Sequence, residues 1–264
     1  MSTSLPDRTV ISITGTDAKA FLQGLVTNDV LALRPDRPLY AALLTPQGKI
    51  LFDFLLFEKD SEVLIDCWKP STDALLRRLT MYRLRAKAEI EFRQDLSVHW
   101  SRETNPDGSP DPRLPELGWR TIGKPASDID NAYLIHRLSL GVPEGGDFGS
   151  DRMFALDADL EELHGVSFAK GCYVGQELTA RMKHRGTARK RLLHLVSRDG
   201  RDLSPVGTEI RAGEISLGEI TAAYGAQGFG LIRLDRLRDT QILPAMAGET
   251  AIRISIPGWI DLKA

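Results

Sequence analysis

The C-terminal third of the chain carries the pattern that most restricts its fold. From Leu192 onward, short apolar stretches are separated by glycines. This pattern is typical of short strands joined by turns, and it predicts a small closed or nearly closed β-barrel. The apolar positions of the expected strands include Leu193, Leu195, Ile210, Ile215, Ile220, Leu231, Ile252, Ile254 and Ile256.

The N-terminal part combines helical and strand patterns. Apolar residues at helical spacing predict a helix over Thr16–Val26, with Thr16 as its cap. A strand, a turn and a second strand are predicted over Leu39–Phe57, and a third strand over Val63–Trp68. A helix capped by Ser71 and a strand over 88–92 follow, so this part is predicted to be an α+β unit.

Two later segments have distinct compositions. Between Asn105 and Pro125 lie five prolines and three glycines, which disfavour a continuous helix or a central strand and indicate a surface connection. A short helix is predicted from Asp157 to His164, with Gly165 as its C-terminal stop.

The charges of the chain nearly cancel. Lys and Arg number 34, and Asp and Glu number 36, for a formal net charge of −2. We therefore expect neither direct binding of nucleic acid nor attraction to a membrane through overall charge. Residues 1–7 resemble neither a secretory signal nor a transit peptide, no apolar stretch is long enough to cross a bilayer, and the two cysteines lie far apart. These features predict a cytoplasmic location.

Residues 170–177 read KGCYVGQE and are the strongest candidate for chemistry. Common phosphate-binding, zinc-protease and hydrolase motifs are absent, and the histidines show no metal-ligand spacing, so no metal is expected. Cys172 lies just before a helix that is predicted to follow Gly175 and to run to about Lys183, with Lys170 close in sequence. A helix N-terminus and a nearby cation favour the thiolate, although the residues alone are equally compatible with a buried loop thiol. Cys67, inside an apolar strand, is predicted to be a core residue.

This segment closely resembles the signature of the YgfZ family, bacterial folate-binding proteins related to the glycine cleavage T-protein and to mitochondrial assembly factors for four-iron iron-sulfur proteins. The resemblance extends over most of the chain. The matching positions are Gly15, Asp17, Ala18, Phe21, Leu22, Gln23, Gly24, Thr27, Asp29, Val30, Gly48, Lys49, Asp53, Tyr82, Arg85, Arg137, Gly141, Pro143, Arg181, Arg185, Gly186, Gly218 and Thr221.

The resemblance implies an α+β fold of the T-protein type, with two interleaved α/β lobes and a C-terminal antiparallel β-barrel in a ring around a central channel. Residues 1–185 would form a folate-binding-like region. One lobe would come from roughly 1–40 with 125–185, and the other from 41–124. Residues 186–264 would form the barrel.

The resemblance also implies a site. Cys172 would be the catalytic residue, and tetrahydrofolate or a derivative would be the cofactor. The implied cofactor-binding residues are Lys170, Tyr173, Gln176, Glu177, Arg137, Ser139, Arg181 and Arg185. In related T-proteins an acidic residue holds the pteridine ring at the position of Ser139, whose hydroxyl cannot reproduce a two-oxygen contact, so weak folate binding is expected. Asp73 falls where T-proteins keep a catalytic aspartate, but we favour a helix-end role for it.

Three functions are compatible with these features. The leading hypothesis is a folate-dependent factor for assembly or repair of four-iron iron-sulfur proteins, with iron-sulfur client or assembly proteins as partners. The alternative is a tetrahydrofolate-dependent aminomethyl- or methyltransferase of the T-protein type. A third, an RNA-associated accessory protein, rests on six cations between Arg181 and Arg191, a run more typical of a solvated face. The same cations would attract the carboxylates of a folate tail.

Overall fold

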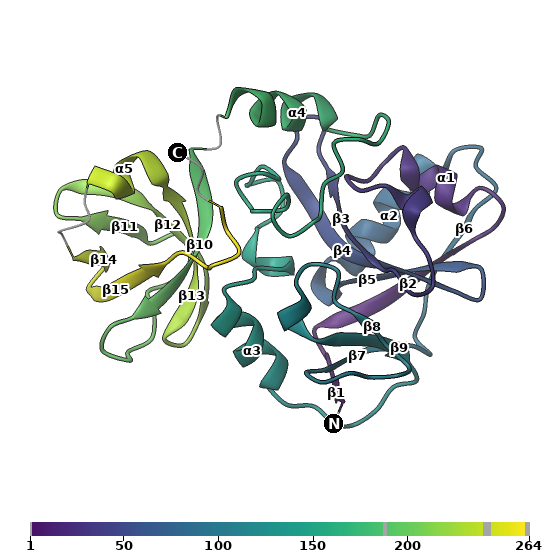
Figure 1. Cartoon of the computed structure of the whole chain (residues 1–264), viewed down its shortest axis with the longest axis horizontal. Coiled ribbons are helices and arrows are strands. Elements are labelled where there is room, and N and C mark those ends of the chain that lie inside the picture. Colours follow the sequence, from purple (N-terminus) through teal and green to yellow (C-terminus); the bar gives the residue numbers. More distant parts are fainter. Residues whose placement is uncertain (1, 187–188, 240–243, 262–264) are drawn as a thin grey trace.

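The N-terminal half is built around a five-stranded antiparallel sheet with the order β3-β4-β5-β2-β6. The computed structural model describes residues 2–186, 189–239 and 244–261 (Figure 1). Helices α1 (Ala18–Gln23) and α2 (Thr72–Arg83) pack on one face of this sheet, where Leu22, Leu75 and Leu79 join strand residues in a buried apolar cluster. The strands are β2 (Arg8–Thr14), β3 (Leu39–Leu44), β4 (Ile50–Lys59), β5 (Glu62–Trp68) and β6 (Glu89–Phe92).

The predicted α+β unit is confirmed, with corrections at its helix caps. Thr16 does not cap α1, because its hydroxyl donates to Asp17 Oδ1 and Asp17 occupies the N-cap position. Ser71 does occupy the N-cap position of α2, but its hydroxyl donates to the carbonyl of Trp68. Two 3-10 turns, η1 (Val30–Ala32) and η2 (Lys69–Ser71), precede β3 and α2 respectively.

A second antiparallel sheet has the order β1-β7-β9-β8. It consists of β1 (Thr3–Ser4), β7 (Ser97–Ser101), β8 (Ser109–Pro110) and β9 (Trp119–Gly123), and the 3-10 turn η3 (Pro115–Leu117) leads into β9. The prediction of a surface connection over 105–125 is therefore wrong. All five prolines lie outside β9, so this strand keeps its backbone N–H groups and pairs on both sides.

Residues 125–186 connect the sheets to the C-terminal part. They include α3 (Ala132–Leu140), the 3-10 turn η4 (Gly145–Asp147) and α4 (Gln176–Arg185). The helix predicted from Asp157 to His164 is wrong, because this segment forms successive turns. Asp159 and His164 adopt positive φ angles of 59° and 57°, which interrupt a right-handed helix.

The predicted C-terminal barrel is confirmed as a closed antiparallel barrel with the order β10-β13-β12-β11-β14-β15. Of the apolar positions assigned to its strands, Leu193, Leu195, Ile210, Ile220 and Ile252 are buried, and Leu231 and Ile254 are partly buried. Ile215 is exposed at the start of β12, and Ile256 is exposed just after the end of β15, outside the strand expected there. The elements are β10 (Lys190–Ser197), β11 (Glu209–Ala212), β12 (Ile215–Tyr224), β13 (Gln227–Arg233), α5 (Leu234–Asp239), β14 (Ala245–Ala247) and β15 (Thr250–Ser255).

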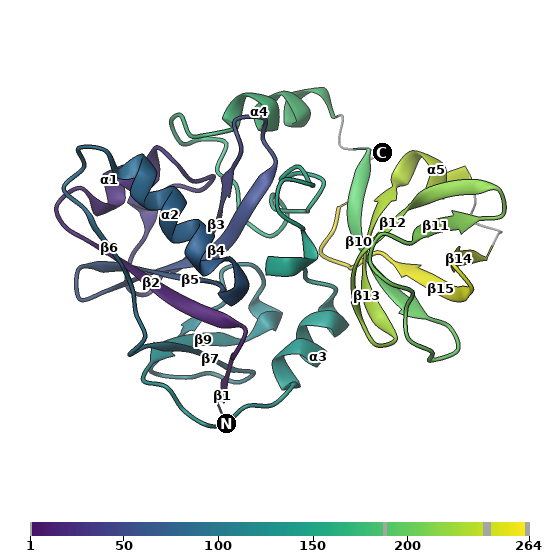
Figure 2. The same ribbon diagram turned by 180° about the vertical axis from the view of Figure 1, so that it is seen from behind.

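The barrel lies at one end of the molecule and the two sheets at the other, with α3 and the chain after it between them (Figures 1 and 2). Strand β2 belongs to the first expected lobe and pairs with β5 of the second, so one sheet spans both lobes. The lobe and domain boundaries themselves stay a prediction. Among the described residues, no helix is long and apolar enough to cross a membrane.

Candidate functional site

The KGCYVGQE segment forms a loop that leads into α4, and Lys170 anchors its first end. The Lys170 side chain donates from Nζ to three backbone carbonyls at the end of α1 and just after it: Gln23 at 2.8 Å, Val26 at 2.6 Å and Asn28 at 2.8 Å. Lys170 is only 8% exposed, and its burial lowers the pKa of the ammonium to about 8. All three N–H groups are used on the protein backbone. Lys170 therefore fixes the loop and has no donor left for a ligand.

Gly175 anchors the other end of the loop against the β3–β4 turn. Its φ angle is +82°, and a Cβ placed on it would lie 2.5 Å from the carbonyl oxygen of Thr45. Only glycine adopts this positive φ angle readily and also lacks the Cβ that would clash with the Thr45 carbonyl. Between the two anchors, Tyr173 is buried with its ring centre 5.1 Å from Lys170 Nζ, whereas Cys172 is exposed. The chain thus presents one thiol at the surface of a loop that is held at both ends.

The remaining motif residues follow along α4. Gln176 is half-buried at the first position of the helix, and Glu177, Arg181 and Arg185 are exposed. The structure therefore brings these four residues, Cys172 and the two buried loop residues into one region around α4, which lies at the top in Figure 1.

Arg137 and Ser139 lie elsewhere, on α3. Arg137 is buried and donates from Nη1 to Asp147 Oδ2 at 2.6 Å and to the carbonyl of Val142 at 2.7 Å. Ser139 is exposed, and its hydroxyl donates to the carbonyl of His136 at 2.7 Å. The eight expected cofactor-binding residues are therefore divided between two separate regions of the fold.

Arg137 belongs to a buried ion network that the sequence analysis missed. Arg120 donates to Asp66 at 2.9 Å and to Asp111 at 3.2 Å. Burial alone would raise the pKa of Glu144, but four nearby arginines hold it well below its usual range. The network also includes Arg8, Arg113, Tyr133 and Asp147. Its central arginines come from the proline-rich segment that composition had suggested was a surface connection.

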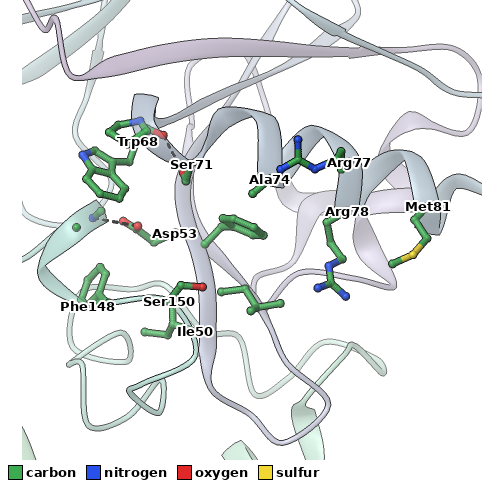
Figure 3. A pocket seen from close by; sticks show the side chains of 16 residues that line it. Ile50, Asp53, Trp68, Ser71, Ala74, Arg77, Arg78, Met81, Phe148 and Ser150 are labelled. Atoms are coloured by element: carbon green, nitrogen blue, oxygen red, sulfur yellow. Dashed lines mark hydrogen bonds between the residues drawn. The ribbon is translucent and has the colours of Figure 1, made fainter.

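A cavity of about 730 Å³ lies between β4, α2 and the η4 segment (Figure 3). Trp68 and Phe148 provide aromatic walls, and Arg77 and Arg78 of α2 also line it. The buried carboxylate of Asp53 also lines it and accepts from Gly145 N at 3.0 Å (Figure 3) and from the Tyr40 hydroxyl at 3.2 Å. Burial raises the pKa of Asp53.

Cys172 is not part of the lining of this cavity. Cys67 is buried as predicted, and burial raises its pKa to about 12. Asp73 is exposed in the first turn of α2, as expected for a helix-end role. Within the described ranges, no group of three or more His, Cys, Asp or Glu side chains is arranged to hold a metal ion.

Comparisons with known proteins bear on both halves of the chain. Residues 189–262 match the family described as "CAF17, C-terminal beta-barrel domain". The chain is 31% identical to the mitochondrial iron-sulfur cluster assembly factor IBA57 of Homo sapiens, over 97% of this chain and 84% of that protein. It is 34% identical to the mitochondrial IBA57 homolog of Mycosarcoma maydis, over 72% of this chain and 56% of that protein.

The fold resembles that of the glycine cleavage system aminomethyltransferase T of Bartonella henselae. The TM-score is 0.73 at 13% identity, over 98% of this chain and 86% of the other. This likeness confirms the expected T-protein fold. The expected cytoplasmic location is wrong by these comparisons, because the relatives aligned over most of the chain are mitochondrial proteins and point to a mitochondrial location.

Proposed function

Because the chain belongs to the IBA57 family of iron-sulfur cluster assembly factors, we propose that it acts in the assembly or repair of iron-sulfur proteins, with Cys172 as its reactive thiol. The observation that carries this proposal is the exposed Cys172 on a loop anchored by Lys170 and Gly175. A fixed, accessible thiol is suited to repeated contact with a partner. The YgfZ-like motif at residues 170–177 supports the same residue.

A single cysteine cannot hold an iron-sulfur cluster alone, since clusters take about four ligands, typically thiolates. Any cluster that contacts Cys172 is therefore the protein's cargo, shared with a partner that supplies the other ligands. In this role the loop orients one thiolate sulfur, and the partner contributes the rest of the coordination.

We also propose that a folate-type molecule binds in the cavity between β4 and α2. A volume of about 730 Å³ is within the range of small-molecule sites. The Asp53 carboxylate can accept from ring N–H groups, Trp68 and Phe148 offer faces for a planar ring, and Arg77 and Arg78 can bind tail carboxylates. These residues fit the ligand better than the exposed Ser139 and Arg181.

The function is tested by complementation of a strain that lacks this protein, with the activities of four-iron enzymes as the readout. We expect wild type and Cys67→Ala to restore these activities and Cys172→Ser not to restore them, at equal protein levels. Full complementation by Cys172→Ser would show that the thiol is dispensable.

The ligand is tested by calorimetric titration of tetrahydrofolate into wild type and into Arg77→Ala/Arg78→Ala. We expect about tenfold weaker binding in the variant, because two charge-assisted contacts are lost. Arg181→Ala/Arg185→Ala is the matched control and should bind like wild type. Equal loss in the control, or no binding by wild type, would contradict this placement.

A further inference from the structure

The C-terminal end of α2 presents apolar and cationic side chains together at the surface. Met81 is 57% exposed and Leu84 is 86% exposed. Arg83, Arg85 and Lys87 are also exposed, and we define these five side chains as the α2-end patch. Helix α2 lies on the opposite side of the molecule from the barrel (Figure 2), so the barrel does not cover this patch.

Packing of the fold explains the inner face of α2 but not the α2-end patch. Leu75 and Leu79 are fully buried against the first sheet. The helix ends at Arg83, and Leu84 follows it with a φ angle of 46° and a ψ angle of −106°. Glycine adopts this conformation readily, whereas leucine is strained in it. A strained leucine with an almost fully exposed side chain adds little to the stability of the fold, so its side chain is suited to an external contact.

The charge near Leu84 is strongly positive. Residues 74–88 contain five cations and no acidic residue, in a chain whose formal net charge is −2. The side chains of Arg85 and Lys87 form no ion pair or hydrogen bond with other described residues. Two acidic residues border the stretch, since the Asp17 carboxylate accepts from the backbone N–H of Lys87 at 2.8 Å and the exposed Glu89 begins β6. The five cations outnumber them, so positive charge is left for an external anion.

We infer that the α2-end patch docks the protein on the surface of an anionic phospholipid bilayer. Clustered cations are attracted to the negative surface of such a bilayer, although the overall charge of the chain gives no such attraction. Exposed apolar side chains beside the cations enter the boundary between the headgroups and the acyl chains. The docking is peripheral and needs no segment that crosses the bilayer. It goes beyond the proposed function and does not depend on Cys172.

Two other occupants fit the patch less well. An acidic protein segment or the carboxylate tail of a folate would pair with the cations but would leave Leu84 in water. A second copy of the chain on the same patch would cover the leucine, but it would also bring like charges together. A bilayer surface satisfies both the apolar and the cationic side chains.

The first test is flotation of the protein with vesicles of phosphatidylcholine and phosphatidylglycerol in equal amounts, compared with vesicles of phosphatidylcholine alone. We expect wild type to bind the anionic vesicles preferentially, and this binding to weaken as salt is added. Arg85→Glu/Lys87→Glu should weaken it about 25-fold or more, because each cation near an anionic surface increases the affinity about fivefold. Arg102→Glu/Lys124→Glu makes the same charge change at exposed positions of the second sheet and should bind like wild type. No preference for anionic vesicles, or an equal loss in this control, would overturn the inference.

The second test replaces the exposed leucine. Leu84→Gly removes the side chain and suits the positive φ angle, so the melting temperature should not fall. We expect about tenfold weaker binding to the anionic vesicles, because the partial burial of one leucine side chain is lost. Ile135→Ala, which truncates an exposed apolar side chain of α3, is the control and should bind like wild type. Met81 is left unchanged because it also lines the cavity between β4 and α2.

The two variants together separate a bilayer from an acidic macromolecule. If Leu84→Gly bound the anionic vesicles as tightly as wild type, the cations alone would account for the binding. That result would overturn a bilayer as the partner and indicate an acidic macromolecule instead.

Discussion

The buried ion network and the exposed face of α4 use the same kinds of charged residue in opposite ways. In the network, Arg113 and Arg120 are fully buried and paired with carboxylates from several elements. The hydroxyl of Tyr224 from the barrel donates to Asp147 at 2.6 Å, so the network also ties the barrel to the rest of the chain. On α4, Arg181 and Arg185 are exposed, and within the described residues they are unpaired. The first region holds the molecule together, and the second is open to a partner.

The largest expected effect comes from breaking the network. Arg120→Ala should lower the free energy of unfolding by about 3 to 5 kcal/mol, because it leaves buried carboxylates without their partner. Arg181→Ala on α4 should change it by less than about 0.5 kcal/mol. Denaturant unfolding of both variants measures the contrast, and similar costs would contradict the division into two regions.

A smaller effect is expected from replacing Lys170, which anchors the loop before α4. Lys170→Met should lower the free energy of unfolding by about 1 to 3 kcal/mol, since it leaves three inward-facing carbonyls without donors. Limited proteolysis should also cut the 166–175 loop faster. Lys183→Met is the control, because its exposed ion pair contributes little. If both variants matched wild type, Lys170 would not be an anchor.

The network should also make folding sensitive to acid. The pKa of Glu144 is held well below its usual range in the folded state, so this carboxylate stabilises the protein above its ordinary pKa. That stability is lost as the pH falls, because the unfolded chain takes up the proton first. Between pH 6 and pH 4, wild type should lose about 1 kcal/mol more stability than Glu144→Gln. If the free energy of unfolding of wild type and of Glu144→Gln depended equally on pH, the lowered pKa of Glu144 in the folded state would be contradicted.

The smallest effect is expected at the exposed thiol. Cys172→Ser should shift the melting temperature by about 2 °C or less, because an exposed side chain contributes little packing. Cys67→Ser should lower it by several degrees, because a hydroxyl would be buried in an apolar strand environment. A large shift for Cys172→Ser in calorimetry would mean that this residue has a structural role.

Local patterns predicted the barrel and part of the N-terminal region. Periodicity gave β3, β4, β5 and β6 of the first sheet, but not β2, the second sheet or α3, and Gly175 correctly marked the start of α4. The 105–125 segment was mispredicted because proline density describes the segment as a whole, whereas β9 occupies its proline-free part. The turns over 157–164 were mistaken for a helix because Leu160 and Leu163 have helical spacing and are indeed buried.

The candidate site was predictable only in part. The motif located Cys172, but Lys170 was assigned to a ligand because nothing local reveals that the carbonyls of Gln23 and Val26 surround its ammonium. The buried network depends on contacts between residues far apart in the chain, such as Asp66 and Arg120. Such pairings arise from the tertiary fold, and a single sequence carries no spacing that reports them.

The two thiols test the contrast between the regions most directly, since Cys172 lies before α4 and Cys67 lies beside Asp66 of the network. Native protein is labelled with iodoacetamide at neutral pH, and each cysteine is followed by mass spectrometry. We predict that Cys172 reacts at least about 100-fold faster than Cys67, which should react only after unfolding. Equal rates, or faster labelling of Cys67, would contradict an open reactive region beside a closed structural one.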